Sequence, residues 1–333
     1  MIEPLVSIIV VNYNGRKYLE ECFTSLKNQS YPNFEVLFVD NHSTDGSVEY
    51  VMENYARFVR IILNKENFGF AKGNNIGICA SQGNYIATLN NDTRVDPNWL
   101  KELVRAAEVD SKIGMCASKI YLMQNKKIID SVGIGIYPDG TSKQRGWLEK
   151  DIGQYAKQEE ILLPSACAAL YRKKMLDEIG LFDEDFFAYC EDTDLGLRGQ
   201  LAGWKCVFVP NAIVKHYYSR TAGKFSDFKA YLVERNHCLV ALKNFPLCIL
   251  LISPFYTCLR LIVQIYSALR LSNKSIRKGR LSVIIIKAYL FVLFNLLKTL
   301  KKRKNIFRGI SDFQVCFWFI KYRLRFRDLV LKE

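Results

Sequence analysis

The 333-residue sequence lacks the short motifs that mark several large classes of nucleotide-dependent protein. It contains no G-x-x-x-x-G-K-S/T phosphate loop, and no G-x-G-x-x-G follows its first apolar run. These absences argue against a P-loop NTPase and a dinucleotide-dependent oxidoreductase, because both classes hold phosphates with glycine-rich loops. The ten cysteines include no C-x-x-C pair, so we expect reduced core thiols rather than a zinc cluster.

The N-terminus lacks the features of a secretory signal peptide. The segment MIEPLVSIIVVNYNG has an acidic residue before its apolar run and no basic region, and the run is too short to span a bilayer. We interpret it as a buried strand. Internal repeats and low-complexity segments are also absent, and 50% of the residues are hydrophobic, which predicts a globular chain with a sizeable core.

Positive charge is concentrated at the C-terminal end of the chain. Residues 270–333 contain 17 Lys and Arg against three Asp and Glu, which accounts for the whole net charge of +14. A neutral body with a basic, apolar-rich tail predicts an acidic partner surface, such as anionic lipid headgroups. Nucleic acid is the other obvious acidic partner, but no nucleic-acid-binding motif accompanies the charge, so we expect none.

Residues 1–223 alternate short apolar runs with amphipathic stretches. Strands are predicted over 5–11, 34–39, 58–63, 85–89, 206–209 and 213–218, hairpin-like pieces over 128–137, and helices over 16–28, 69–81, 191–201 and from Pro97. This alternation predicts an α/β fold with a doubly wound, mostly parallel sheet. Such sheets bind ligands beyond the carboxyl ends of their strands, where Asn12, Asp40 and Asp92 fall.

Two polar clusters follow predicted strands. Asp40 could accept a hydrogen bond from a nucleobase imide, or it could serve only the turn and helix start around Asp45-Gly46. Asp92, in Asn90-Asn91-Asp92, could be a hard oxygen ligand for Mg²⁺ or Mn²⁺, or an ordinary turn residue.

Two further candidates lie later in the chain. The run Glu191-Asp192-Thr193-Asp194 places three carboxylates in four residues, more than a helix start requires, and one of them could be a general base. His216, one of three histidines, could ligate a divalent metal, or it could be an ordinary core or surface residue.

Taken in series, these motifs resemble the family-2 inverting glycosyltransferases, with rhamnosyltransferase-like members the most similar. The resemblance covers about residues 4–222 and implies a GT-A fold. It is carried by VSIIVVNYNG, YPNFEVLFVDNHSTDGS, ENFGFAKGNN, GNYIATLNNDTRVDPNWL and GLFDEDFFAYCEDTDLGLR, followed by GW and KH.

The resemblance implies a role for each candidate residue. Asp192 matches the usual general base, with Glu191 and Asp194 as supporting carboxylates. The segment Asn90-Asn91-Asp92 resembles a D-x-D metal motif in which Asn90 replaces the first acid, a departure that leaves room for weaker metal binding. The implied ligands of Mg²⁺ or Mn²⁺ are Asp92, His216 and Asn90. The implied donor-binding residues are Val11, Asn12, Tyr13, Asp40, Lys72, Asn75 and Asn91.

The resemblance therefore implies transfer of a sugar, with rhamnose one candidate, from a UDP- or dTDP-sugar to a hydroxyl of a lipid-linked or polysaccharide acceptor. A non-catalytic, sugar-nucleotide-binding scaffold of the same fold is the alternative, and Asn90 favours it. A nucleotidyltransferase is a third class, but Tyr13-Asn14-Gly15-Arg16 makes a poor phosphate loop for one.

The pattern changes after residue 223, so we expect a catalytic domain over 1–223 and a helical, basic and apolar extension over 224–333. Its apolar stretches, 247–269 and 281–300, are long enough to form a membrane hairpin. That hairpin would carry five basic residues of 270–280 across the membrane and insert Arg260 at a cost of about 2.5–3.5 kcal/mol. We expect instead a cytoplasmic protein, peripheral on the inner face of the membrane, with a helical subdomain or homo-oligomer contact as the alternative use of the tail.

Overall fold

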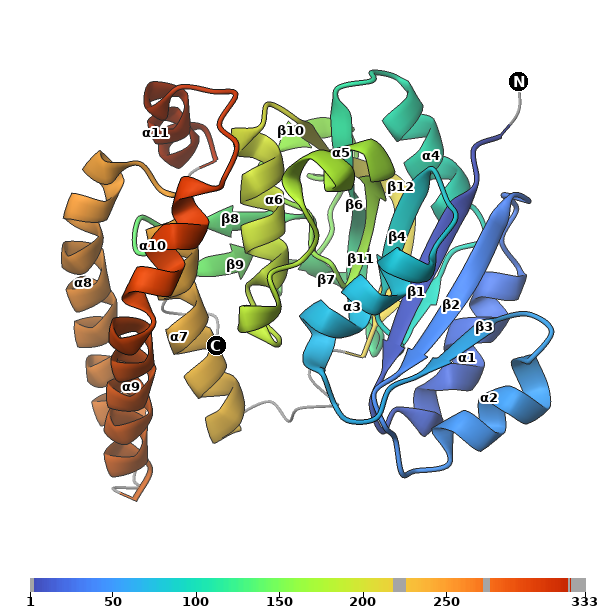
Figure 1. Cartoon of the computed structure of the whole chain (residues 1–333), viewed down its shortest axis with the longest axis horizontal. Helices are drawn as coiled ribbons and strands as arrows, with labels where there is room; N and C mark the ends of the chain where they lie inside the picture. Colours follow the sequence, from blue (N-terminus) through green and yellow to red (C-terminus); the bar gives the residue numbers. More distant parts are fainter. Residues whose placement is uncertain (1–2, 218–225, 272–275, 323, 325–333) are drawn as a thin grey trace.

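A run of β-branched residues at the N-terminus forms the central strand of a ten-stranded sheet in the computed structural model (Figure 1). The structure describes residues 3–217, 226–271, 276–322 and 324. Strand β1 (Val6–Asn12) is almost fully buried and pairs in parallel with β2 (Phe34–Asp40) and β4 (Tyr85–Leu89), and β2 pairs in parallel with β3 (Arg60–Leu63). The helices between these strands are α1 (Arg16–Lys27), α2 (Ser47–Tyr55) and α3 (Gly69–Ala80).

The second half of the sheet is mixed. Strand β11 (Ala168–Arg172) lies antiparallel between β4 and β6 (Ile113–Leu122), and β12 (Lys205–His216) runs parallel to β6. The two strands predicted over 206–209 and 213–218 are thus one strand with a register shift between Val209 and Ile213, and residue 218 lies outside the described residues. The shorter strands are β5 (Thr93–Val95) and β10 (Glu159–Ile161) on β12, β7 (Asn125–Ser131) on β6, and the separate pair β8 (Ile134–Ile136) and β9 (Ser142–Gln144).

Alternating side chains of β1 enter two cores on opposite faces of the sheet. Ile8 and Val10 pack with α1, α2 and α4 (Trp99–Glu108), whereas Ile9 packs with α3, α5 (Lys173–Ile179) and α6 (Glu191–Leu201). Helix α3 approaches β1 closely, since a Cβ at Gly77 would lie 2.6 Å from Ile9. Gly73, four residues earlier in α3, approaches β1 in the same way, because a Cβ there would lie 2.8 Å from Val11.

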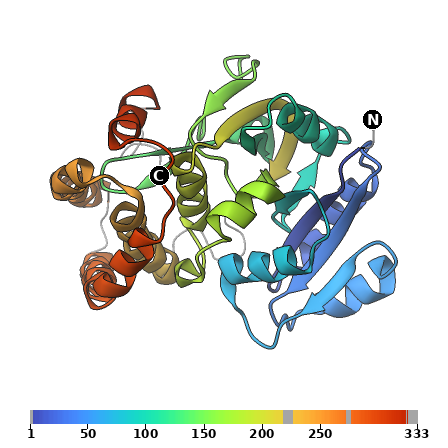
Figure 2. The ribbon, with the colours of Figure 1, turned by 45° about the horizontal axis from the view of Figure 1, so that its top comes forward.

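Five helices of the extension stand at the end of the molecule remote from β3 (Figures 1 and 2). A third core joins α6 to α7 (Asp227–Asn244) and to α8 (Leu247–Leu271), α9 (Ile276–Phe294) and α11 (Asp312–Lys321). The predicted apolar stretch 281–300 is divided at Asn295, where α10 (Leu296–Lys304) begins. The boundary predicted at 223 falls in residues 218–225, outside the described residues, and two independent folding units stay a prediction.

No single helix among the described residues is long and apolar enough to cross a membrane, although Ser282–Phe294 and Leu296–Lys304, bent by 56°, meet the length and composition criteria together. Arg260 is buried in α8, where its guanidinium binds Asp139 at 2.9 Å and Glu234 at 2.6 Å. The Arg260 side chain, whose charge argues against membrane insertion, therefore connects α8 to the body of the protein through these ion pairs.

Candidate active site

The tips of β1, β2 and β4 are joined by side-chain hydrogen bonds. In-register pairing places Asn12 beside Asp40, and the Asn12 amide donates to the Asp40 carboxylate at 2.8 Å. The Asn91 amide donates in turn to Asn12 Oδ1 at 2.6 Å. A Cβ at Gly15 would lie 2.1 Å from Asn91 Nδ2, so the glycine that precedes α1 leaves room for this chain of contacts. Three of the predicted donor-binding residues thus lie together.

Asp40 is buried and already accepts hydrogen bonds from Ser43, at 2.8 Å from the backbone N–H and at 2.7 Å from the hydroxyl. These contacts support the turn that leads to α2. A carboxylate has about four lone-pair sites, so the contacts to Ser43 and Asn12 still leave acceptor capacity for a ligand. A contact between Asp40 and a nucleobase stays a prediction.

The other predicted donor-binding residues have different surroundings. Tyr13 is exposed at the strand tip, and Val11 packs against Gly73 of α3. The Lys72 ammonium lies over the Phe68 ring, 3.9 Å from its centroid. The Asn75 amide donates to the Phe182 carbonyl at 2.9 Å and its oxygen accepts from the Phe182 N–H at 3.0 Å, so this side chain ties α3 to the segment before the short 3₁₀ helix η1 (Glu184–Phe186). Donor contacts by these residues stay predictions.

Pairing between β5 and β12 places His216 opposite Thr93 and thereby beside Asp92. The distance from His216 Nε2 to Asp92 Oδ1 is 3.2 Å. On the other side of the ring, His216 Nδ1 lies 2.6 Å from Oδ2 of Asp130, which comes from β7. All three side chains are buried, so the two acids and the imidazole form one enclosed row.

Burial by itself would lower the pKa of His216, but the nearby Cys167, Asp92 and Asp130 raise it well above its ordinary value. The carboxylates thus stabilise a positive charge at the imidazole, which is the place where a metal ion would replace the proton. An oxygen of Asp92 and a nitrogen of His216 suit a divalent cation, and the Asp130 contact fixes the ring in the way that carboxylates orient metal-binding histidines.

No group of three or more His, Cys, Asp or Glu suited to a metal occurs among the described residues. A cation held here would therefore take its remaining ligands from elsewhere, and Mg²⁺ is often held by one or two carboxylates together with substrate phosphates. Asn90 lies in the same turn, where its backbone N–H donates to the Cys167 carbonyl at 2.8 Å. A ligand role for Asn90 stays a prediction.

The three carboxylates at the start of α6 have three different environments. Asp194 is fully buried and binds Arg198 at 2.9 Å and Lys243 at 2.8 Å. Burial would raise the pKa of Asp194, but these two cations outweigh it and lower the pKa far below its ordinary value. The ion pairs of Asp194 therefore connect α7 to α6, and a supporting role for Asp194 in catalysis stays a prediction.

Glu191 is also buried, and its Oε2 has no hydrogen-bond partner in the described part of the chain. Burial, together with the neighbouring Asp192 carboxylate, raises the pKa of Glu191 well above its ordinary value. Asp192 is half-buried and accepts from the N–H of Thr193 at 2.7 Å and of Ala166 at 3.2 Å. Burial raises the pKa of Asp192, although those hydrogen bonds oppose the shift. Of these three acidic residues, Asp192 is the one that is partly exposed, whereas Glu191 and Asp194 are buried.

The loop before Asp192 is held in an unfavourable backbone conformation. Phe187, Tyr189 and Cys190 have φ angles of 64°, 68° and 65°, in the left-handed region that non-glycine residues seldom occupy. The amide of Asn236, on α7, donates to the carbonyls of Ala188 at 2.9 Å and Tyr189 at 2.7 Å. The neighbouring Arg235 donates to the Phe186 carbonyl at 2.8 Å. Helix α7 thus imposes the loop conformation that positions Asp192.

Sequence reasoning missed Asp130, Arg235 and Asn236. Asp130 was visible only as an acid within an apolar segment, and Asn236 as a polar residue within a predicted helix. Their partners are 86 and about 50 residues away, so spacing along the chain carries no signal for either contact.

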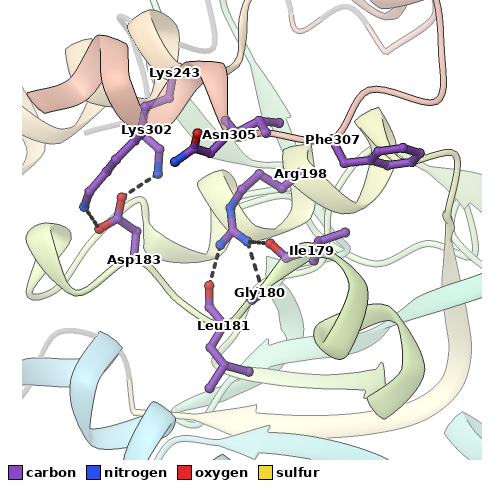
Figure 3. A pocket seen from close by; sticks show the side chains of 10 residues that line it. Ile179, Gly180, Leu181, Asp183, Arg198, Lys243, Lys302, Asn305 and Phe307 are labelled. Carbon is purple, nitrogen blue, oxygen red and sulfur yellow. Dashed lines mark hydrogen bonds and ion pairs between the residues drawn. The ribbon is translucent and has the colours of Figure 1, made fainter. Parts of the chain in front are cut away.

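A separate pocket of about 230 Å³ lies between α6, α7 and α10 (Figure 3). Its cations already have partners: Lys243 and Lys302 bind Asp183, and Arg198 donates to the carbonyls of Ile179 and Leu181 at 2.7 and 2.6 Å. The pocket therefore lies where the extension packs on the body, and its charged side chains form ion pairs and hydrogen bonds with one another and with nearby carbonyls.

Much of the sequence that forms this sheet and site also matches the model of a known protein family. The model of glycosyl transferase family 2 matches residues 7–180. The chain belongs to that family. This membership agrees with the family that the sequence motifs predicted.

Curated relatives of the family agree. An uncharacterized glycosyltransferase of Haemophilus influenzae is 32% identical over 224 residues, which cover 64% of this chain and 65% of that one. An N-acetylglucosaminyl-diphospho-decaprenol L-rhamnosyltransferase of Mycobacterium tuberculosis is 27% identical over 250 residues, which cover 66% of this chain and 78% of that one. The chain spans 65% of the length of the Haemophilus protein and 41% of the length of the putative glycosyltransferase EpsH of Bacillus subtilis.

Solved structures establish the fold. A mannosyltransferase of Pyrobaculum calidifontis in complex with GDP-Man and Mn²⁺ superimposes with a TM-score of 0.53 at 14% identity, covering 92% of this chain and 86% of that one. GalNAc-T7 with UDP, GalNAc and Mn²⁺ superimposes with a TM-score of 0.56 at 17% identity, covering 70% of this chain and 48% of that one. The predicted GT-A fold, a mainly parallel central sheet followed by C-terminal helices, is confirmed.

Proposed function

We propose that this glycosyltransferase moves a sugar from a UDP- or dTDP-sugar to an acceptor hydroxyl and inverts the anomeric centre. The observation that carries the proposal is the row of Asp92, His216 and Asp130 at the tips of the strands, with Asp192 as the accessible carboxylate at the start of α6. Solved neighbours hold GDP-Man or UDP together with Mn²⁺, which supports a nucleotide-sugar donor and a divalent cation.

Asp92 and His216 are the residues that would hold Mg²⁺ or Mn²⁺, with Asp130 orienting the imidazole. A bound cation would stabilise the negative charge that builds on the departing nucleoside diphosphate. The structure gives no side-chain contact for Asn90 in this site, and its position in the same turn keeps it a candidate third ligand.

Asp192 would accept the proton of the acceptor hydroxyl while that oxygen attacks the anomeric carbon from the face opposite the diphosphate. One carbon–oxygen bond to the acceptor forms, the bond to the diphosphate breaks with its electron pair, and a single displacement inverts the centre. General-base assistance of this kind contributes about 10²–10⁴ in rate. Burial raises the pKa of Asp192, which makes it a stronger base than an exposed aspartate.

Rhamnose as the sugar, and a lipid-linked or polysaccharide acceptor, are the finer parts of the proposal. The mycobacterial relative is an N-acetylglucosaminyl-diphospho-decaprenol L-rhamnosyltransferase, and a relative from Bacillus subtilis is a putative teichuronic acid biosynthesis glycosyltransferase. Such acceptors suit a catalytic domain over 1–223 that works at the inner face of a membrane, with the extension over 224–333 in contact with it or forming a homo-oligomer.

A non-catalytic scaffold that only binds sugar nucleotides is the competing function, favoured by Asn90 at the position of the first acid of the metal motif. The two functions differ in what they do to a bound donor, since a scaffold retains it unchanged.

Calorimetric titration with a panel of nucleoside diphosphates and nucleotide sugars, with and without Mn²⁺, tests the donor site. The proposal expects Mn²⁺-dependent binding of a uridine or thymidine diphosphate sugar by the wild type, loss of that binding in Asp92→Ala, and retention in Asp96→Asn, a control four residues along the chain. If no nucleotide binds, the donor-site assignment is wrong. If donor binds but is neither transferred nor hydrolysed, the scaffold function is favoured.

A further inference from the structure

Three helical segments of the extension carry stripes of exposed, large apolar side chains. Fifteen of the 22 such side chains in the described residues lie between 247 and 320, so the excess is local. Within each helix, the spacing of three, four or seven residues places the set on one face, and Leu297 follows the bend between α9 and α10. We call these three stripes together the apolar wall. Its members are Leu247, Leu251, Phe255 and Ile262 on α8; Val283, Ile286, Leu290, Leu293 and Leu297 on α9 and α10; and Phe313, Phe317 and Ile320 on α11.

The wall lies on the outer side of the extension. Figures 1 and 2 both show α8, α9 and α11 at the end of the molecule farthest from β2 and β3. Helix α7 lies between the sheet and the pair α8 and α9, whereas α11 contacts β10 through the ion pair of Lys321 with Glu160. The inner sides of these helices are already occupied, because Ile249 of α8 and Val315 and Trp318 of α11 are buried in the core shared with α6 and α7. Within the described part of the chain, the exposed stripes therefore lie apart from the buried sides of these helices.

Exposed lysines accompany the wall. Lys287 on α9 and Lys301 and Lys304 on α10 are exposed, whereas Lys298 and Lys302 are matched by Asp185 and Asp183. Each basic side chain near an anionic leaflet strengthens binding about fivefold. A helix face rich in Phe and Leu beside lysines is the composition of helices that lie in the interface of a bilayer.

The same charge argues against a second copy of this chain as the occupant. A symmetric dimer through the wall would bring together residues 270–333 of two copies. This segment has a net charge of +14 in each copy, and like charge opposes such a contact. Crossing of the bilayer is also disfavoured, since no single described helix meets the criteria for a span and Arg260 fixes α8 to Asp139 and Glu234.

We propose that the apolar wall docks on an anionic lipid bilayer, with its Phe and Leu side chains inserted in the plane of the headgroups and Lys287, Lys301 and Lys304 on the lipid phosphates. This deepens the proposed function, on which it rests for its purpose, because a lipid-linked acceptor is met at such a surface. Vesicle binding needs no catalysis, so the two proposals fail separately.

Co-sedimentation of the full chain with vesicles of phosphatidylglycerol and phosphatidylcholine, compared with phosphatidylcholine alone, is the test. Full burial of one Leu or Phe side chain is worth about 1.5–3 kcal/mol, or roughly tenfold or more in affinity. Leu251→Ser/Phe255→Ser and Phe313→Ser/Phe317→Ser should each weaken binding to the anionic vesicles at least about tenfold. Met52→Ser/Ile152→Ser, which removes exposed apolar side chains outside the wall, should bind as the wild type does.

Lys301→Glu/Lys304→Glu should weaken binding most strongly at low salt, and phosphatidylcholine vesicles should bind poorly throughout. Equal binding by the wall variants and the control, with unchanged circular dichroism and melting, would overturn the proposal. Two other results would do so as well: a wild-type dimer without lipid that the wall variants dissociate, which identifies a second copy as the occupant, or resistance of bound protein to alkaline carbonate, which identifies a span. Donor binding by the wall variants, measured in parallel, reports on the proposed function alone.

Discussion

His216 Nδ1 lies 2.6 Å from Asp130 Oδ2, so the imidazole whose other nitrogen faces Asp92 is held from behind by a second carboxylate. This contact fixes the ring orientation and favours a proton on Nδ1, which leaves Nε2 available to a cation. Asp130 lies on β7, whereas the proposed metal ligands Asp92 and His216 belong to other segments. Its positioning role does not require contact with any substrate.

Replacing Asp130 tests this positioning role. Loss of a carboxylate behind a metal-binding histidine typically costs 10–100-fold in metal affinity. We therefore expect Asp130→Asn to weaken Mn²⁺ binding by about that factor, measured by electron paramagnetic resonance in the presence of nucleoside diphosphate. Asp110→Asn removes an exposed carboxylate that pairs with Lys205 and should leave Mn²⁺ affinity unchanged. Equal affinity in Asp130→Asn and wild type would remove Asp130 from the site.

Substitution of Asp192 should lower kcat, whereas substitution of Asp194 should lower the free energy of unfolding. Asp192→Asn removes the proposed base, so we expect kcat to fall by about 10²–10⁴ while donor affinity and melting temperature change little. Asp194→Asn leaves Lys243 and Arg198 buried beside a neutral amide, and breaking a buried ion pair costs about 3–5 kcal/mol. Urea unfolding and steady-state kinetics on both variants separate the two roles. Full activity in Asp192→Asn would contradict the base assignment.

Asn236 should act on the reaction through the loop before Asp192. Asn236→Ala removes the hydrogen bonds that hold Ala188 and Tyr189, so the left-handed residues can relax and Asp192 loses its place. We expect kcat to fall while the KM for donor stays within about twofold, with unfolding free energy lowered by about 1–3 kcal/mol. Asn295→Ala, which loses a comparable contact to the Phe291 carbonyl, is the control and should lose stability without loss of kcat in the folded fraction.

The ion-pair network around Arg260 predicts that the free energy of unfolding falls at acidic pH. Burial would raise the pKa of Glu234, but hydrogen bonds from His237 and Arg260 outweigh it and lower the pKa to about 2 from 4.5. A depressed folded pKa means that this contribution, about 3 kcal/mol, is present above pH 4.5 and lost as the pH falls toward 2.

Unfolding in urea from pH 7 to pH 3 should therefore show a steeper loss of stability in the wild type than in Glu234→Gln. His237 and Arg260 are the charged groups that face Glu234, and Asp139 lies on the far side of Arg260. The raised pKa of His237 acts in the alkaline direction, so it does not produce this loss of stability. Parallel profiles for the two proteins would remove Glu234 as its source.

Local pattern was sufficient to predict much of the fold and to nominate the site. The apolar run at Val6–Asn12 has few alternatives to a buried strand, and its polar end places Asn12 at the ligand edge of the sheet. Asp92 and His216 were nominated because their residue types suit a divalent metal, and Asp192 was singled out from three neighbouring carboxylates by the family resemblance. The contacts that give them their properties are long-range: Asp130 meets His216 only after β7 folds back on β6 and β12 pairs with β6.

The partners of Arg260 could not be predicted either, because they are also distant in the sequence. The sequence shows an arginine within an apolar stretch and allows its insertion cost to be estimated, but Asp139 and Glu234, its partners, lie 121 and 26 residues away. Asp192 and Asp194 both stand at the start of one helix. Arg198 follows Asp194 by four residues in that helix, but the second cation that neutralises Asp194, Lys243, comes from α7 and is brought there only by the fold.

The stereochemistry of the released sugar tests the central claim most directly. The full chain is incubated with Mn²⁺ and the UDP- or dTDP-sugar that it binds, and proton NMR records the anomer first formed by transfer, or by slow hydrolysis when no acceptor is present. The account predicts a product of anomeric configuration opposite to that of the donor, formed by the wild type and lost in Asp192→Asn. A first product that retains the donor's configuration would contradict single displacement with Asp192 as the base.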